Sequence, residues 1–302
     1  MPGRTRIVYT DAYLVDIGNH VFPTEKYKMV RDLLIKNDGL KEENFIQPKP
    51  ADDKDILLAH TKSYLDKLKK GALSREEQLR LELPYSRELV DASLLCVDGS
   101  IMASKFALED MVGIHLGGGF HHAFPDHGEG FCVFNDIAIA IRRLKKEGLI
   151  RKAMVIDCDL HHANGTAYIF QGDKDVFTFS IHQENNYPFP KPPSNLDIGL
   201  EDGAGDKRYL EELYKNIPKI IETFKPDLII YVAGADPYKE DQIGNLGLTI
   251  EGLRKRDEFI FETSNRLKVP VCVLLAGGYA VRKEDTAEIH YNTVRTGLRY
   301  AQ

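Results

Sequence analysis

Short apolar segments rich in β-branched residues alternate along this chain with longer amphipathic segments. Several of the short segments are apolar at every position, as expected of parallel strands covered on both faces. Alternation of this kind predicts an α/β fold with a mainly parallel sheet flanked by helices. The expected strands are 6–9, 112–116, 153–157, 176–181, 228–233 and 271–276. The expected helices are 24–37, 52–70, 87–108, 136–147, 207–224, 249–267 and 284–300.

The length of 302 residues, without an internal repeat or a low-complexity linker, favours one domain that spans residues 1–302. Asp52 and Thr249 have side chains suited to N-cap the helices that follow them, and Glu251 suits the positive end of the second helix. The segment 183–206 is rich in Pro, Asn and Gly. A loop of this length in a compact domain is usually functional or disordered.

Composition excludes several classes of protein. The net charge is −6, and no dense block of Lys and Arg is present, so we expect no nucleic-acid partner. No apolar run reaches the length of about 18 residues that a membrane span needs. The opening residues MPGRTRIVYT carry no long apolar stretch of a secretion signal, so we expect a cytoplasmic protein. The four cysteines form no C-x-x-C pair and lie in apolar segments, which favours core positions over a cysteine-based zinc site.

Polar residues follow directly after four of the apolar segments. The segments at 112–116, 153–156, 228–233 and 271–276 lead into GGGFHH, DCDLHH, GAD and GGY. In open α/β sheets, ligands bind beyond the carboxyl ends of the strands. Four strand ends therefore deliver glycine, carboxylate, imidazole and phenol groups to one edge of the predicted sheet.

The motif VIDCDLHHANGT carries Asp157, Asp159 and His161 at a spacing of two. If the strand continues through them, all three side chains face the same way. An Asp and a His at a strand end can bind a divalent metal, and zinc accepts nitrogen and oxygen ligands. Asp236, at the end of another strand, is the best candidate for a third ligand. The alternative is that these residues are helix caps and surface acids.

The motif GGGFHHAFPDHGEGFC places His121 and His122 after three glycines. Two adjacent imidazoles beside a metal can act as general base and general acid. Such a pair needs orienting partners, and Asp157 and Asn164 are available. The alternative is a pair of hydrogen-bonded structural histidines. A phosphate cradle at 117–119 is disfavoured, because the G-x-G-x-x-G spacing is missing.

Tyr279 follows two glycines in LLAGGYA. A phenol at this strand end can donate a hydrogen bond to a developing oxyanion opposite the metal. The alternative is a packed aromatic residue.

The ordered motifs GGGFHHAFPDHGEGFC, VIDCDLHHANG, AGADPYKEDQIG and AGGYA resemble those of the histone deacetylase superfamily. The likeness covers nearly the whole chain. The Phe in GGGFHH, the ANG after the second His pair and LTIEGLRKRDEFIF look most like the class IV branch and its bacterial relatives. The resemblance implies the arginase–deacetylase fold, which is a single α/β domain around a mainly parallel eight-stranded sheet.

The resemblance also implies roles for individual residues. The zinc ligands of the family fall on Asp159, His161 and Asp236. Its tandem catalytic histidines fall on His121 and His122, and its transition-state tyrosine falls on Tyr279. The carboxylate that orients the first histidine falls on Asp157. The partner of the second histidine, often Asp in the family, is Asn164 here, and a neutral amide supports an imidazolium less well than a carboxylate.

The wall of the acyl channel in the family maps to Gly130 and Phe131. The opposing aromatic residue is expected in the loop 183–190, with Tyr187 or Phe189 as the candidate. The family also carries a structural potassium ion bound largely by backbone carbonyls. Those carbonyls map near Asp157, Asp159, His161, Ser180 and Ile181.

The activity implied by the resemblance is zinc-dependent removal of an acetyl or longer fatty-acyl group from lysine side chains of proteins or peptides. Small acetylated amines and polyamines are alternative substrates. The polyamine-selective branch resembles a different pattern, with a gatekeeper Glu after the metal Asp, and this chain has Ile243 at that place.

Three alternative functions belong to other classes of protein. The first is a metal-binding scaffold that has lost catalysis, which the complete set of histidines, ligands and tyrosine argues against. The second is an arginase-like manganese hydrolase, which would need more carboxylates for two metals. The third is a nucleotide-dependent enzyme, which rests only on the glycines at 117–119.

Overall fold

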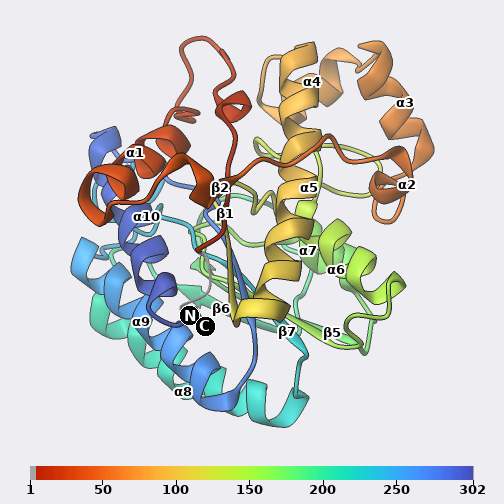
Figure 1. The fold of residues 1–302 in the computed structure, drawn as a ribbon. Helices are drawn as coiled ribbons and strands as arrows, with labels where there is room; N and C mark the ends of the chain where they lie inside the picture. The colour runs from red at the N-terminus through yellow and green to blue at the C-terminus, as the bar shows by residue number, and fades with distance from the viewer. Residues whose placement is uncertain (1–4, 302) are drawn as a thin grey trace.

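The computed structural model of this chain describes residues 5–301, in which eight strands form one parallel sheet (Figure 1). The strands are Ile7–Val8 (β1), Phe45–Ile46 (β2), Val112–His115 (β3), Ala153–Asp157 (β4), Val176–Gln183 (β5), Leu196–Leu200 (β6), Leu228–Val232 (β7) and Val271–Leu274 (β8). Their order is β2-β1-β3-β8-β7-β4-β5-β6, and each pair of neighbours runs parallel. The predicted α/β class is confirmed. Residues 1–4 and 302 of the predicted domain lie outside the described residues.

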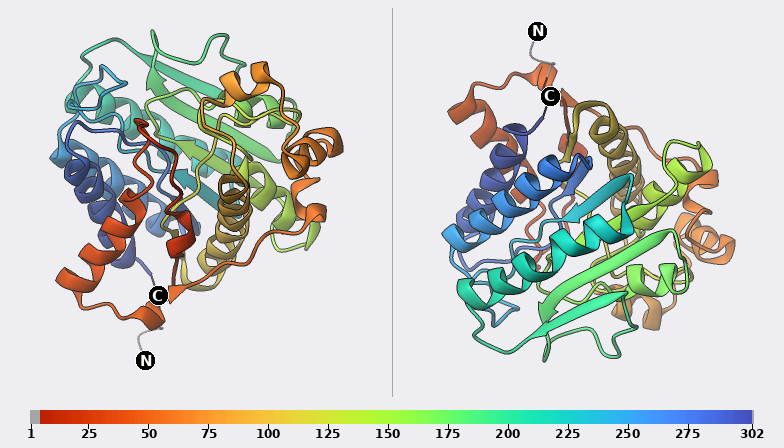
Figure 2. Two further views of the ribbon diagram at one scale, coloured as in Figure 1. Left: turned by 90° about the horizontal axis from the view of Figure 1, so that it is seen from above. Right: turned by 90° about the horizontal axis from the view of Figure 1, so that it is seen from below.

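Helices cover both faces of the sheet. They are Lys26–Asp38 (α1), Asp53–Ile56 (α2), Lys62–Lys70 (α3), Arg75–Leu81 (α4), Arg87–Asp110 (α5), Asp136–Lys146 (α6), Asn164–Phe170 (α7), Asp206–Phe224 (α8), Ile250–Leu267 (α9) and Lys283–Leu298 (α10). Helices α1, α10, α9 and α8 pack in that order along one face, and the last three lie side by side in Figure 2. Helices α5, α6 and α7 cover the opposite face.

The continuous apolar strands are explained by these two layers. On β7, Ile229 and Tyr231 belong to the hydrophobic cluster that includes α8 and α9, whereas Ile230 and Val232 belong to the cluster that includes α5 and α6. Successive side chains of a strand point to opposite faces, so each side chain of a strand covered on both faces meets one of the two helical layers. Within residues 5–301, no helix is both long and apolar enough to cross a membrane.

The prediction of one continuous helix over 52–70 was wrong. The structure has two helices there, α2 and α3, which are separated by residues 57–61. The chain leaves α2 because His60 and Thr61 contact the loop after β3. Nε2 of His60 accepts a hydrogen bond from the backbone N–H of Asn135 (2.9 Å), and the backbone N–H of Thr61 donates to the carbonyl of Pro125 (2.7 Å). Thr61 then caps α3. Asp52 precedes α2 as predicted, but its side chain makes no capping hydrogen bond. Thr249 caps α9 as predicted, accepting from the N–H of Gly252.

The segment 183–206 is not only a loop, because it contains β6. Residues of β6 alternate between partly buried and exposed positions, as on an edge strand with one covered face. β6 pairs with β5 from Phe179↔Leu196 to Gln183↔Leu200. Its polar and glycine positions (Asp197 and Gly199) and the Pro-rich residues before it hide it from a search for apolar runs. The edge strand β2 and the helices α4 and α7 were also missed, because each is too short to show a clear apolar periodicity.

Candidate active site

The loops after β3, β8, β7 and β4 meet at one edge of the sheet, because these four strands are consecutive neighbours. They carry all the polar motifs noted in the sequence. β4 ends at Asp157, as predicted, so the condition that the strand continues through Asp159 and His161 is not met. Two side-chain to backbone hydrogen bonds shape the turn instead. The N–H of Asp159 donates to Oδ1 of Asp157 (3.1 Å), and the N–H of His161 donates to Oδ1 of Asp159 (3.0 Å).

Asp159, His161 and Asp236 come together as a buried group with metal-ligand geometry, and no other group of this kind lies within residues 5–301. Nδ1 of His161 lies 3.1 Å from Oδ1 of Asp159 and 3.4 Å from Oδ2 of Asp236. Oδ2 of Asp236 is buried without a hydrogen-bond partner. An orphaned buried carboxylate oxygen is costly unless something binds it. Two carboxylates and one imidazole are a donor set that suits zinc and leaves a fourth position open.

Gly277 leaves room for this group. A Cβ at this position would lie 2.1 Å from Oδ2 of Asp236 and 2.5 Å from Oδ2 of Asp159. The backbone N–H of Gly277 also donates to Oδ2 of Asp159 (2.9 Å). The glycine therefore lets the loop after β8 approach the two carboxylates more closely than any side chain would allow.

His121 and His122 face each other, with 3.1 Å between their Nε2 atoms. Nδ1 of His121 lies 2.8 Å from Oδ2 of Asp157, and Nδ1 of His122 lies 2.6 Å from Oδ1 of Asn164. The two imidazoles thus have different partners, one charged and one neutral, as the sequence predicted. In each ring Nδ1 contacts the partner residue, and Nε2 faces the other imidazole.

The two environments move the pKa values of these histidines apart. Burial disfavours the charged form of His121, but the carboxylates of Asp157 and Asp159 outweigh burial and raise the pKa of His121 to about 9. Burial lowers the pKa of His122 well below its ordinary value, and the neighbouring imidazoles of His121 and His161 lower it further. Such a pair presents one charged and one neutral imidazole at neutral pH.

Asn135 and Asp136 hold the loop that carries the histidine pair, a function that the sequence did not suggest. Asp136 accepts hydrogen bonds from the backbone N–H groups of Gly119 (3.0 Å) and Phe120 (2.8 Å). Nδ2 of Asn135 donates to the carbonyl of Ala123 (3.2 Å). Asn135 and Asp136 are fully buried, so the start of α6 fixes this loop from the interior of the protein.

A cavity of about 190 Å³ lies beside His122 and His161. Its lining consists of Glu82, His122, Gly130, Phe131, His161, Asn186, Tyr187, Ile243 and Tyr279. Four of the five predicted channel residues therefore line it. The fifth, Phe189, is 73% exposed and is not brought to the cavity.

Phe131 and Tyr187 form aromatic walls of this cavity. Phe131 has a φ of 66°, a left-handed conformation that is strained for a residue with a side chain, and it follows Gly130 with a φ of 50°. The ring of Tyr187 lies 5.1 Å from the ring of His122. Strain of this kind at a cavity wall is common at functional sites.

Tyr279 is placed by its backbone, whose N–H donates to Oδ2 of Asp241 (2.8 Å). Its side chain lines the cavity, and its ring lies 6.5 Å from the ring of His161. Burial raises the pKa of Tyr279 well above its ordinary value, and the carboxylates of Asp159 and Asp236 add to the rise. The phenol therefore stays protonated at neutral pH and available as a hydrogen-bond donor.

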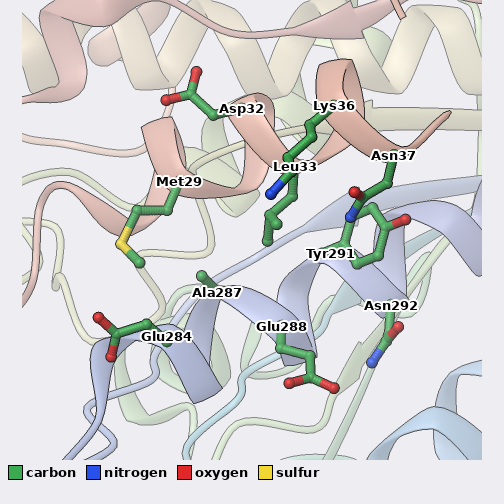
Figure 3. Close-up of a pocket in the computed structure, with 10 residues that line it drawn as sticks. All are labelled: Met29, Asp32, Leu33, Lys36, Asn37, Glu284, Ala287, Glu288, Tyr291 and Asn292. Carbon is green, nitrogen blue, oxygen red and sulfur yellow. The ribbon is translucent and has the colours of Figure 1, made fainter. Parts of the chain in front are cut away.

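A larger cavity of about 550 Å³ lies elsewhere, between α1 and α10 (Figure 3). Side chains of the two helices face one another across it, among them Met29, Leu33, Ala287 and Tyr291. It contains none of the histidines or metal-ligand candidates. The larger of these two cavities is therefore not the candidate active site.

Three polar residues at or beside the cavity were missed by sequence reasoning, namely Glu82, Asn186 and Glu129. Glu82 and Asn186 line the cavity from the loops after α4 and β5. Glu129 lies inside the quoted GGGFHHAFPDHGEGFC motif and contacts Asn164. Only Glu129 had a sequence signal, as a charged residue between two glycines close to the histidine pair.

Comparison with known proteins supports the resemblance to histone deacetylases. The profile of the histone deacetylase domain matches residues 20–294. An uncharacterized protein of Picosynechococcus is 37% identical over 94% of this chain and 95% of its own length. Histone deacetylase 2 of Arabidopsis thaliana is 30% identical over 91% of this chain and 75% of its own length.

A solved structure shares the fold. The crystal structure of an HDAC homolog complexed with SAHA has a TM-score of 0.82 at 23% identity, and the match covers 97% of this chain and 84% of that one. This likeness is in keeping with the arginase–deacetylase fold expected from the motifs. Because the family profile matches nearly the full chain, this protein belongs to the histone deacetylase family of hydrolases.

Proposed function

We propose that this chain is a zinc-dependent amidohydrolase that removes an acyl group from lysine side chains of proteins or peptides, with residues 1–302 as one catalytic domain. One observation carries the proposal. The buried group of Asp159, His161 and Asp236, with its orphaned carboxylate oxygen, lies beside a paired set of imidazoles at a narrow cavity. Membership of the histone deacetylase family supports the reaction type.

Asp159, His161 and Asp236 would hold the zinc ion. When bound, zinc would polarise the acyl carbonyl and lower the pKa of a bound water toward about 7. The buried position of all three ligands excludes bulk water from the site, which strengthens electrostatic interactions there.

His122 has the role of proton carrier. Its Nδ1 faces Asn164, so its Nε2 is the atom that takes a proton from the attacking water and later donates it to the leaving amine. His121 lies beside it with Nδ1 on Asp157, and this pairing stabilises a positive charge next to the reacting atoms. Asp157 is thus the orienting carboxylate of the pair.

Tyr279 donates a hydrogen bond to the oxyanion that develops on the acyl carbonyl. Its protonated phenol lines the cavity beside His161, which suits this role. A donor that is fixed in place before the reaction is among the strongest contributors to catalysis.

The substrate enters along Gly130, Phe131, Tyr187 and Ile243. An aromatic and aliphatic lining suits the methylene chain of an acyl-lysine. Ile243 brings no carboxylate to the place where a polyamine-selective site would carry one, which favours lysine over polyamine substrates. We further propose that backbone carbonyls near Asp157 and Ser180, which are register partners on β4 and β5, hold a structural potassium ion.

The test is a panel of lysine peptides that carry acyl groups from acetyl to myristoyl, with acetylated diamines and polyamines assayed in parallel. We expect turnover of at least one peptide, its loss with a zinc chelator, and its return on adding zinc. Turnover of the small amines alone would move the substrate assignment to that class. Stoichiometric zinc binding without turnover of any compound would identify a catalytically dead scaffold and refute the proposal.

A further inference from the structure

Asn164 lies between His122 and Glu129 and contacts both with short hydrogen bonds. Oδ1 of Asn164 lies 2.6 Å from Nδ1 of His122. Nδ2 of Asn164 donates to Oε1 of Glu129, also at 2.6 Å. His122 and Asn164 are buried, and the side chain of Glu129 is 17% exposed. The hydrogen-bonded series from imidazole to amide to carboxylate joins two segments of the sequence, the loop after β3 with His122 and Glu129 and the start of α7 with Asn164.

The chemistry of these groups leaves one consistent arrangement of protons. An amide side chain can turn either its oxygen or its NH₂ group toward a neighbour, so Asn164 alone does not define what His122 must do. An ionised carboxylate can only accept hydrogen bonds. Glu129 therefore requires the NH₂ group of Asn164, which leaves the amide oxygen for His122. That oxygen in turn requires a proton on Nδ1 of His122.

We propose that Glu129 is a positioning residue that locks the amide of Asn164 and thereby keeps His122 protonated at Nδ1 and unprotonated at Nε2. In the sequence, Asn164 stands where a carboxylate is often expected, and Glu129 restores a carboxylate one residue further from the imidazole. The consequence for catalysis rests on the proposed function, in which Nε2 of His122 carries the proton. The arrangement of the three side chains does not depend on that function.

Glu129 is built to serve as a fixed acceptor. Its backbone is held by two hydrogen bonds with Cys132, from the N–H of Glu129 (3.1 Å) and from the N–H of Cys132 (2.9 Å). Its Oε2 lies 3.4 Å from Nε2 of His127. Burial opposes ionisation, but the hydrogen bonds from His127 and Asn164 outweigh it and lower the pKa of Glu129. Glu129 does not line the cavity, so a direct contact with substrate does not explain it.

The kinetic test compares Glu129→Ala and Glu129→Gln with the unmodified enzyme on the best acyl-lysine peptide. We expect E129A to lower kcat by roughly 10- to 100-fold, the range seen when an outer-shell partner is removed, with KM nearly unchanged. E129Q should fall between the two, because a glutamine oxygen can accept from Asn164 but can also turn away. Asp126→Asn is the matched control. Asp126 is on the same loop and contacts Nδ1 of His127, on the other side of that ring from Glu129, so D126N should keep kcat.

Asn164→Asp provides a test that a merely structural role of Glu129 would fail. In that background a carboxylate accepts directly from Nδ1 of His122, and no amide remains to be locked. Glu129 then faces a like charge, so E129Q should leave kcat unchanged or raise it, in contrast to its effect on the unmodified enzyme. An equal loss of kcat in both backgrounds would overturn the proposal.

A spectroscopic measurement tests the protonation of His122 directly and needs no activity assay. Nitrogen-15 NMR of the histidine rings, with His122 assigned by its loss in His122→Phe, should show His122 protonated at Nδ1 in the unmodified protein. In E129A the same ring should show a mixture of tautomers or protonation at Nε2. An unchanged His122 spectrum in a folded E129A protein would refute the positioning role. If the unmodified protein turned over no acyl compound, the proposed function would fail while this measurement still tested Glu129.

Discussion

Oδ2 of Asp157 lies 2.8 Å from Nδ1 of His121, and both side chains are buried. This contact gives the histidine pair its asymmetry, since the other imidazole faces the neutral amide of Asn164. The carboxylate of Asp157 raises the pKa of His121, and burial lowers the pKa of His122. Two residues of one type thereby acquire different charges within one site.

Asp157→Asn should remove the charge from this contact while keeping its shape. We expect kcat to fall by ~100-fold or more, because loss of a general acid–base arrangement typically costs that much. The pKa of His121 should drop from about 9 toward or below its ordinary value, which NMR titration measures. Zinc content serves as the control, since Asp157 also shapes the turn to Asp159. Full activity with a lowered pKa of His121 would show that the charge is not used in catalysis.

Tyr279→Phe should lower kcat by roughly 100- to 1,000-fold, the cost of removing one donor to an oxyanion in other enzymes. The ring remains, so its contacts with Phe131 and Phe22 should persist and the melting temperature should change little. Steady-state kinetics and thermal unfolding check the two statements. A variant with full activity would exclude the phenol from the mechanism.

Gly277→Ala should weaken metal binding. The new methyl carbon would lie 2.1 Å from Oδ2 of Asp236, so the carboxylates or the loop must move. We expect less zinc per protein by elemental analysis and a matching loss of activity. Gly205→Ala is the control, because its Cβ would meet only the carbonyl of Gly247 at 3.6 Å, and its zinc content should be unchanged. Normal zinc in G277A would argue against Asp236 and Asp159 as ligands.

His60 should make the fold sensitive to acid. Burial lowers its pKa to about 4, so the folded protein keeps His60 neutral while the unfolded chain binds a proton as the pH falls through about 6.5. The free energy of unfolding should therefore decrease between about pH 6.5 and pH 4, by up to ~1.4 kcal/mol per pH unit from this residue.

His60→Gln provides the comparison for this prediction. Its amide oxygen can accept the same hydrogen bond from the N–H of Asn135 but does not titrate. Urea unfolding at a series of pH values should show a slope that is smaller by about that amount. His115, whose pKa burial lowers to about 3, remains in both proteins and cancels in the comparison. Equal slopes would contradict the prediction.

Much of the fold was predictable because its signals are local. The buried strands β3, β4, β7 and β8 are apolar at nearly every position, and their ends carry the polar motifs. β6 escaped because an edge strand with one covered face carries Asp197 and Gly199 among its apolar residues. The break between α2 and α3 escaped because it depends on contacts of His60 and Thr61 with residues 60 to 80 positions away.

By itself, the sequence determined the class of the fold and the identity of the chemical groups, since apolar periodicity and short motifs are properties of neighbouring residues. Only the tertiary structure decided how those groups are used. It turns Tyr187 into the cavity and leaves Phe189 outside, and it sets Glu129 behind Asn164. These outcomes rest on hydrogen bonds and packing between segments distant in the chain, which fix the direction of each side chain and which of its atoms faces the site.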